Sequence, residues 1–373
     1  VLIRLLAVIE IGSKKKTSTI EKVNKMKNEK ASWTTCDKCE GSGKKSRRIR
    51  QKTRARKEKG SLHPKKQNIE ETTPEPPKYY IEPCPTCSGS GLLQSTTQTI
   101  IDKENYPHIA IIGGGIGGTA LAVACLHRGI PFTIYERDNS FDERSQGYGL
   151  TLQQASKAIE GFGIFTLEEG IISTRHVIHS PEGEIISEWG SRNRPKSGTE
   201  NPSKRRNIHI ARQSLRLALL EQLGGQDKIK WSHQLMDFKE TKGKGIDLNF
   251  QVNGKMHSAK ADLMVGADGI RSTTRKLLIS EETTPLRYLD CIVILGICLL
   301  ADLKGIESDL LDGETVFQTA SGDTRIYIMP FSSDSVMWQL SFPMPENEAK
   351  ALSEKGVKAL KEEACLRTQW HSP

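Results

Sequence analysis

The hydrophobic pattern first becomes regular at residue 109, where the four residues Ile109 to Ile112 are all apolar. An unbroken apolar run of this kind is typical of a strand that is buried on both faces. Five glycines follow within positions 113 to 118, and a small apolar run, Thr119 to Leu126, comes after them. Gly129 then ends the expected helix, and Phe132 to Glu136 is expected to be a second strand. This order predicts a βαβ unit of about thirty residues.

Beyond residue 206 the pattern predicts a mixture of strands and helices. The expected elements are a strand at Asn207 to Ala211, a helix at Gln213 to Leu223, a hairpin of Ile246 to Val252 with Met256 to Ala259, several strands between Leu286 and Phe342, and one amphipathic helix from Glu346 to Arg367. Asn253-Gly254, between the hairpin strands, is a strong hairpin signal. The polar stretch Ser191 to Arg206 has no structural period and is expected to be a loop. Together these elements indicate an α/β fold.

Composition changes at about residue 105. Residues 1 to 100 contain 22 Lys and Arg against 10 Asp and Glu, whereas the rest of the chain contains 32 against 35. Residues 12 to 105 are also poor in large apolar side chains, so they cannot form a core unaided. The N-terminal part is therefore expected to be a basic, largely irregular segment. Such a segment suits nucleic acid or an acidic partner, although a solvated run is the more common explanation.

The eight cysteines fall into two classes. Four stand singly and are expected to be small buried apolar residues: Cys125, Cys291, Cys298 and Cys365. The other four form two copies of CxxCxGxG, and they are Cys36, Cys39, Cys84 and Cys87. Two thiolates from each tight turn would complete a closed tetrahedral zinc site, which is structural rather than catalytic. The alternative is a pair of turns without metal.

The doubled cysteine motif resembles the zinc region of J-protein chaperones, in which four copies of CxxCxGxG occur. Two copies imply a single zinc ion, which would supply the order that the composition of this segment cannot. No disulfide framework is indicated, so a reducing, intracellular compartment is expected. No stretch reaches the roughly 20 apolar residues that cross a bilayer, so no transmembrane segment is expected.

The glycine run satisfies GxGxxG through Gly113, Gly115 and Gly118. The first glycine lets the chain turn out of the strand, the second admits a pyrophosphate, and the third lets helix and strand approach. The helix N-terminus then supplies partial positive charge for the phosphates. Glu136, at the end of the second strand, can accept hydrogen bonds from both hydroxyls of an adenosine ribose. A carboxylate there would repel a ribose phosphate, so the residues leave FAD and NAD open and disfavour NADP.

Three further motifs resemble those of the para-hydroxybenzoate hydroxylase family of FAD-dependent aromatic hydroxylases. Asp262 to Ser272, followed by Arg275, is similar to the second fingerprint of that family. Glu136-Arg137 with Arg144 and Gly147 is similar to the segment after its second strand, and Ile210 to Arg216 is similar to its strand-to-helix arginine motif. The resemblance covers about residues 106 to 373. It implies that FAD is contacted by residues from all three motifs: Arg137, Arg144, Arg212, Asp268 and Gly269.

The resemblance also implies a Rossmann-like FAD-binding domain interleaved with a mixed-sheet substrate domain. The expected FAD-binding domain comprises residues 106–175 and 207–285, and the expected substrate domain comprises residues 176–206 and 286–373. The basic zinc-binding segment, residues 1–105, precedes them. The third fingerprint of the family is expected beyond Pro373, and the chain, which begins at Val1, is expected to be incomplete at both ends.

The function implied by the resemblance is that of a flavoprotein monooxygenase. NAD(P)H would supply electrons and O2 the oxygen atom that hydroxylates an aromatic or similar small substrate. The flavin carries this chemistry, so no protein nucleophile or catalytic residue is nominated. Two alternatives stay open: an FAD-dependent reductase or halogenase, and a non-enzymatic zinc-binding interaction protein with a degenerate flavin domain.

Overall fold

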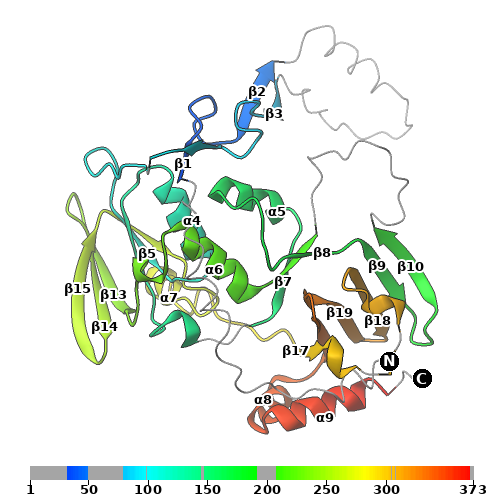
Figure 1. The fold of residues 1–373 in the computed structure, drawn as a ribbon. Coiled ribbons are helices and arrows are strands. Elements are labelled where there is room, and N and C mark those ends of the chain that lie inside the picture. Colours follow the sequence, from blue (N-terminus) through cyan, green and yellow to red (C-terminus); the bar gives the residue numbers. More distant parts are fainter. Residues whose placement is uncertain are drawn as a thin grey trace, which may run out of the picture.

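The computed structural model describes residues 32–48, 79–97, 99–143, 147–190, 207–303, 305–306 and 308–369. The described residues form three parts, and the second and third are interleaved along the chain. We call residues 32–48 and 79–97 the metal module, after the four cysteines that are predicted to bind zinc. The flavin half is built on a parallel sheet, and the third part is built on a six-stranded sheet. Figure 1 shows the metal module at one end of the molecule, next to helix α4 (Ile116–Leu126). Helices α8 (Glu346–Glu354) and α9 (Val357–Arg367) lie at the opposite end.

A four-stranded parallel sheet forms the centre of the flavin half. Its order is β12-β6-β5-β16, and the strands are β5 (Ile109–Ile112), β6 (Phe132–Tyr135), β12 (Ile229–Lys230) and β16 (Leu263–Gly266). The predicted β-α-β order is confirmed, with α4 spanning Ile116–Leu126. The buried strand β5 explains the unbroken apolar run, because successive side chains point to opposite faces of a sheet and both faces are covered.

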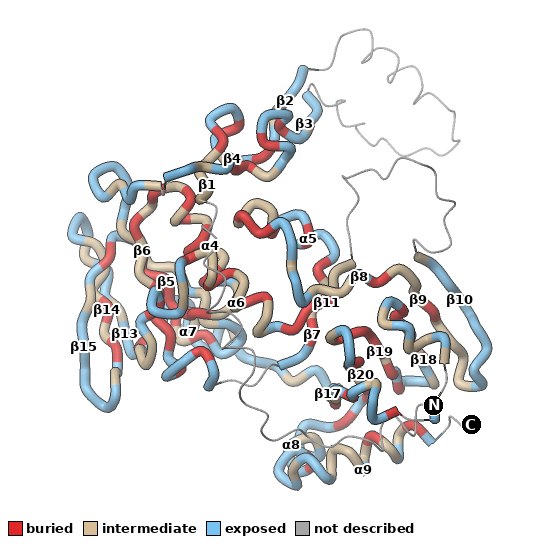
Figure 2. The backbone as a smooth tube through the Cα atoms, in the orientation of Figure 1, coloured by how far each residue is buried: buried red, intermediate tan, exposed pale blue. Residues whose placement is uncertain are grey.

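Different elements cover the two faces of this sheet. Ile109 and Ile111 pack into one core with helix α4 and helix α6 (Arg212–Gln222). Ala110 and Ile112 pack on the other face, against an antiparallel sheet made of β13 (Gln234–Thr241), β14 (Gly245–Val252) and β15 (Lys255–Ala261). Figure 2 shows the buried residues of these layers in red.

The predicted hairpin turn is confirmed between β14 and β15. Asn253 has φ 48° and Gly254 has φ 79°, the left-handed values that a two-residue hairpin turn of this sequence requires. Short elements complete the flavin half, and they are η1 (Phe141–Glu143), α5 (Ala155–Ala158), η2 (Ile159–Phe162), η3 (Gln226–Lys228) and α7 (Thr273–Ile279).

A three-stranded antiparallel sheet, β7-β11-β8, connects the flavin half to the six-stranded sheet. The strands are β7 (Gly149–Leu152), β8 (Ile171–Ile172) and β11 (Ile208–Ala211). Ile210 belongs to the core of the flavin half, whereas its neighbour Ala211 packs with Met329 and Met337 of the six-stranded sheet. The period of two along β11 therefore directs alternate residues into two different cores.

The six-stranded sheet has the order β10-β9-β18-β19-β20-β17, in which only the β9–β18 pair is parallel. Its strands are β9 (Arg175–His179), β10 (Ile185–Gly190), β17 (Cys291–Leu299), β18 (Thr315–Ser321), β19 (Thr324–Ser332) and β20 (Ser335–Pro343). Two short 3-10 turns lie between β17 and β18, η4 (Leu300–Asp302) and η5 (Asp309–Leu311). The boundaries expected between an FAD-binding and a substrate domain stay predictions.

The prediction of a single helix from Glu346 to Arg367 is wrong. The structure has two helices, α8 (Glu346–Glu354) and α9 (Val357–Arg367). Gly356 separates them, with φ 80°, a left-handed conformation that interrupts helical hydrogen bonding. Leu352 and Ala364 nevertheless pack into the same core, so both helices cover one face of the six-stranded sheet.

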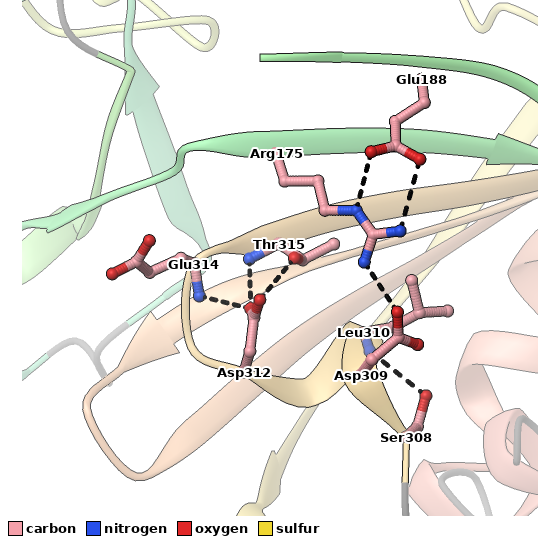
Figure 3. A network of polar contacts seen from close by, with 8 residues as sticks. All are labelled: Arg175, Glu188, Ser308, Asp309, Leu310, Asp312, Glu314 and Thr315. Carbon is pink, nitrogen blue, oxygen red and sulfur yellow. Dashed lines mark hydrogen bonds and ion pairs between the residues drawn. The ribbon is translucent and has the colours of Figure 1, made fainter. Parts of the chain in front are cut away.

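Arg175 fastens the outer strands of the six-stranded sheet to the turn before β18 (Figure 3). Its guanidinium donates from Nε to Oε1 of Glu188 on β10, at 3.1 Å, and from Nη1 to Oδ2 of Asp309, at 2.9 Å. Asp312 holds the same turn by accepting from the amide and hydroxyl of Thr315, at 2.7 and 2.9 Å. The charge-assisted bonds of Arg175 link strands β9 and β10 to η5, which precedes β18.

Two of the four single cysteines follow the expectation of burial, namely Cys125 and Cys298. Cys291 does not, because it lies on the exposed face of the edge strand β17, and Cys365 is half-buried. Within the described ranges, no helix combines the length and apolar character needed to cross a membrane.

Candidate functional site

The glycine-rich loop between β5 and α4 is closed so tightly that two of its positions exclude any side chain. Gly113 has φ 108°, and a Cβ there would lie 2.5 Å from the carbonyl oxygen of Ala267. A Cβ on Gly118 would lie 1.9 Å from the carbonyl oxygen of Gly113. These distances are far below van der Waals contact, so both positions require glycine in this conformation.

The opposite side of the loop is open. A Cβ at Gly115 or Gly117 would meet no atom within 4 Å. Gly115 is the N-cap of α4 and provides no side-chain cap, so among the described residues the first-turn amides have no side-chain acceptor from the cap position. Amides and the positive end of a helix dipole that face open space fit a pyrophosphate.

Glu136 is buried behind the loop, with an exposed fraction of 6%. Its Oε2 accepts a hydrogen bond from the amide of Gly114 at 2.7 Å, and its Oε1 accepts one from the amide of Asp138 at 3.2 Å. A carboxylate can accept about four hydrogen bonds, so the predicted contact with ribose hydroxyls stays compatible with this geometry. Arg137, the next residue, is exposed at the end of β6.

Arg216 is a site residue that the sequence did not identify. It is buried, with an exposed fraction of 4%, and its Nε donates to the carbonyl oxygen of Gly114 at 2.7 Å. Its guanidinium carbon also lies 5.0 Å from the ring centre of Phe141 and 5.4 Å from that of Trp231. Gly114 is thus held through its amide by Glu136 and through its carbonyl by Arg216. The signal that could have found Arg216 is its position on the apolar face of a helix that otherwise buries leucines there.

The motif Asp262 to Ser272 lies against the glycine loop. The amide of Ala267 donates to the carbonyl oxygen of Ile112 at 2.7 Å, directly before the glycine loop. Asp268 accepts from the hydroxyl of Ser272 at 2.5 Å and from the amide of Thr274 at 3.0 Å, so it orders the start of α7. Gly269 is exposed and has φ 79°. Ile112 and Ala267, which are 155 residues apart in the sequence, therefore meet at the loop.

The arginines predicted to contact the cofactor do not lie in the glycine loop itself. Arg212 is exposed at the start of α6, where its Nη1 donates to the hydroxyl of Tyr148 at 3.0 Å. Arg144 lies outside the described residues, and its predicted contact stays a prediction. The structure brings together Gly113, Gly115, Gly118, Glu136 and Asp268. Arg137, Arg212 and Gly269 are exposed, and their contacts with FAD stay predictions.

A buried histidine lies where the three-stranded sheet meets the six-stranded sheet. His209 on β11 has no exposed surface, and one ring nitrogen, Nδ1, lies 3.0 Å from the hydroxyl of Thr151. The other, Nε2, has no hydrogen-bond partner within the described part of the chain. Burial, with a smaller contribution from His176, lowers the pKa of His209 from 6.5 to about 4. The imidazole is therefore neutral at physiological pH.

This burial predicts an acid-dependent loss of stability. The unfolded chain takes up a proton on His209 below about pH 6.5, whereas the folded chain does so only near pH 4. The contribution of the neutral His209 to the unfolding free energy is therefore complete above pH 6.5, and it is lost as the pH falls toward 4. Between pH 7 and pH 4.5 we expect the wild type to lose about 2 kcal/mol more unfolding free energy than the His209→Asn variant, measured by urea denaturation. Parallel pH profiles would contradict this expectation.

The four cysteines of the two CxxCxGxG motifs converge in the metal module. Their sulfur atoms all lie within 4.8 Å of one another, and all four residues are buried. The Sγ atoms of Cys39 and Cys87 are 3.7 Å apart. Four sulfurs at about 2.3 Å from a central zinc would be separated by about 3.8 Å, so the geometry fits a tetrahedral tetrathiolate site. A disulfide, which needs about 2.05 Å, does not describe this pair.

The two motifs of the metal module face each other with near two-fold symmetry. The amide of Cys36 donates to the carbonyl oxygen of Gly91 at 2.9 Å, and that of Cys84 donates to the carbonyl oxygen of Gly43 at 2.8 Å. A Cβ at Gly43 would lie 2.3 Å from the carbonyl oxygen of Gly89, so the second motif glycine is required for this approach. Two strand pairs frame the site, β1 (Ser32–Thr35) with β4 (Leu92–Ser95) and β2 (Lys44–Arg48) with β3 (Tyr79–Pro83).

In a comparison with known families, residues 107 to 368 match the FAD binding domain family. The chain belongs to this family. The matched range begins two residues before β5 and ends directly after α9, so it includes both motifs that meet at the glycine loop and excludes the metal module.

The curated relatives of this chain include several monooxygenases. A probable FAD-dependent monooxygenase of Arthroderma benhamiae is 32% identical over 187 residues, which cover 48% of this chain and 41% of the relative. The aurachin C monooxygenase/isomerase of Stigmatella aurantiaca is 27% identical over 243 residues, which cover 64% of this chain and 57% of the relative. The chain therefore spans about half the length of the curated relatives that it matches.

Several solved structures have a fold similar to that of this chain. HpxO of Klebsiella pneumoniae, in complex with FAD and uric acid, has a TM-score of 0.53 and 20% identity, covering 72% of this chain and 67% of that one. The 2,6-dihydroxypyridine-3-hydroxylase of Arthrobacter nicotinovorans has a TM-score of 0.52 and 16% identity, covering 73% and 71%. At these identities the likeness concerns the fold alone.

Proposed function

We propose that this protein is an FAD-dependent monooxygenase that uses NAD(P)H and O2 to hydroxylate an aromatic or similar small organic substrate. The observation that carries the proposal is the glycine loop, closed on one side by Ala267 and open on the other, in a chain that belongs to the FAD binding domain family. The monooxygenase relatives support the reaction type.

In this proposal the residues of the chain bind and orient the cofactor. The first-turn amides of α4 hold the pyrophosphate, and Gly115 admits it because the space beside its Cα is open. Glu136 accepts hydrogen bonds from the adenosine ribose while it holds the amide of Gly114. When bound, FAD supplies the electron transfer and oxygen chemistry that protein side chains lack.

The remaining predicted residues are assigned to the same site as part of the proposal. Arg137, Arg144 and Arg212 would contact FAD, and Asp268 with Gly269 would line the region that serves both FAD and NAD(P)H. Residues 106–175 and 207–285 would form the FAD-binding domain. Residues 176–206 and 286–373 would form the substrate domain, whose occupant is a small molecule.

We also propose that Cys36, Cys39, Cys84 and Cys87 bind one structural Zn²⁺. The convergence of four buried sulfurs supports this site. Four cysteine ligands would fill all four tetrahedral positions and leave none open for water or substrate, so the role of this zinc would be structural. Coordination by four thiolates requires reduced cysteines, which supports a reducing intracellular compartment.

The test uses the full chain, incubated with FAD, freed of unbound cofactor and then supplied with NADH or NADPH. We expect flavin absorbance that stays with the protein and is released as FAD on denaturation. With phenolic substrates, ¹⁸O2 should label the product. NAD(P)H oxidation that yields only peroxide across the substrate panel would instead support a reductase. A protein that includes the third fingerprint of the family and still retains no FAD would contradict the proposal and favour a zinc-binding interaction protein.

A further inference from the structure

The metal module is seated on the flavin half through Trp33 of β1. The indole covers Gly163, at the end of η2, so closely that a Cβ on this glycine would lie 2.6 Å from Cδ1 of Trp33. The ring centre of Phe165 lies 4.9 Å from that of Trp33. Trp33 precedes the first metal-binding cysteine by only three residues, so its position depends on the fold of the metal module.

A second contact involves the C-terminal end of helix α4. Arg128, two residues beyond the helix, donates from Nη2 to the carbonyl oxygen of Gly41 at 3.2 Å and from Nη1 to that of Ala124 at 3.1 Å. Gly41 belongs to the first cysteine motif, where its amide donates to the carbonyl oxygen of Cys36 at 3.2 Å. One guanidinium thus bridges the last turn of α4 and the metal-binding turn.

The chain that leaves the metal module follows the same end of α4. The hydroxyl of Thr99 donates to the carbonyl oxygen of Trp33 at 3.1 Å, and the amide of Asp102 donates to that of Gly129 at 2.8 Å. Gly129 directly follows Arg128. The metal module is therefore fastened at its entry strand, its first motif and its exit to one region of the flavin half.

Helix α4 connects this region to the glycine loop. It has 11 residues, so its two ends are separated by about 16 Å. The metal module contacts the C-terminal end, and the proposed pyrophosphate site lies at the N-terminal end. Apart from the cysteines, the buried Leu92 and the half-buried Leu93, the metal module buries little apolar surface, so a bound metal ion would be the main source of its order.

We propose that zinc binding at the four cysteines braces helix α4, and so couples zinc occupancy to the stability and FAD affinity of the flavin half. The surface that receives the metal module consists of Gly163, Phe165 and Arg128, and its partner is this chain itself. The inference rests on the zinc site proposed above and adds to it a thermodynamic link with the flavin site.

The experiment compares zinc-loaded full chain with the same chain after a thiol-compatible chelator has removed the metal under reducing conditions. Zinc content, the melting midpoint and the FAD dissociation constant are measured on both. We expect one zinc per chain, a midpoint that falls by about 4 °C or more on zinc removal, and FAD binding that weakens at least about threefold.

The Trp33→Ala variant tests the docking surface, because it keeps all four cysteines. It should bind one zinc, yet zinc removal should change its midpoint and FAD affinity by less than half as much as in the wild type. Trp189→Ala, which removes a partly exposed indole from β10, is the matched control and should respond to zinc as the wild type does.

The outcomes separate the two proposals. A wild-type chain that binds no zinc would overturn the zinc site and the brace with it. Stoichiometric zinc whose removal leaves the midpoint and FAD affinity unchanged would overturn the brace and leave the zinc site standing. A full zinc response in Trp33→Ala would overturn the assigned docking surface.

Discussion

Replacing Gly118 with alanine is expected to give a chain that no longer retains FAD. The added Cβ would lie 1.9 Å from the carbonyl oxygen of Gly113, which is backbone and cannot swing aside. Helix α4 must then move away from β5, and the amides of its first turn move with it. We expect the unfolding free energy of the apoprotein to fall by about 3 kcal/mol, measured by urea denaturation, and no flavin to remain bound after gel filtration.

Alanine variants of two neighbouring glycines distinguish a loss of stability from a loss of the proposed pyrophosphate site. A Cβ at Gly115 or Gly117 meets nothing within 4 Å, so neither alanine variant should destabilise the apoprotein. Gly115→Ala occupies the space assigned to the pyrophosphate and should weaken FAD binding at least about tenfold. Gly117→Ala is the control for added helix propensity. Wild-type FAD affinity in Gly115→Ala would show that the pyrophosphate lies elsewhere.

Replacing Arg216 with methionine is expected to weaken both the fold and the cofactor site. The change removes the bond from Nε to the carbonyl oxygen of Gly114 and the contacts with Phe141 and Trp231, while it keeps an apolar stem. The loss of a buried charge-assisted hydrogen bond predicts a decrease of about 2–3 kcal/mol in unfolding free energy. FAD affinity should fall about tenfold or more, because Gly114 is then held by Glu136 alone.

The measurements are urea denaturation of the apoprotein and titration with FAD. Arg287→Met removes an exposed arginine and should change the unfolding free energy by less than about 0.5 kcal/mol. Arg216→Lys should remain closer to Met than to wild type, because an ammonium cannot stack on two rings and reach the same carbonyl. If Arg216→Met bound FAD like the wild type, Arg216 would only stabilise the fold.

The glycine loop could be predicted from the sequence because its determinants are local. A buried strand, five glycines in six positions and a small-residue helix specify the turn with no help from distant residues. The hairpin at Asn253-Gly254 is a similar case, since both residues adopt the left-handed conformations that this pair favours. The convergence of the four cysteines followed from the doubling of one short motif.

Features that depend on distant partners could not be read in this way. Arg216 appears in the sequence as one charged residue in a leucine-rich helix, and its burial becomes clear only when Gly114, 102 residues away, lies beside it. Trp33 likewise gives no local sign that it packs on Gly163. Gly356 is a local signal for a helix end, but the apolar pattern continues on both sides of it and therefore predicts one helix in place of two.

The contact between Gly113 and Ala267 has a consequence for the order of events during protein synthesis. A ribosome that has finished α4 and β6 has made the glycine loop, but the strand β16 that lies beside β5 and the carbonyl that fits against Gly113 have not yet been translated. At about 5–20 residues per second, several seconds or more pass before that partner emerges from the exit tunnel. During this interval one edge of the nascent parallel sheet is open to pairing with other strands, which makes it a natural point of contact for chaperones.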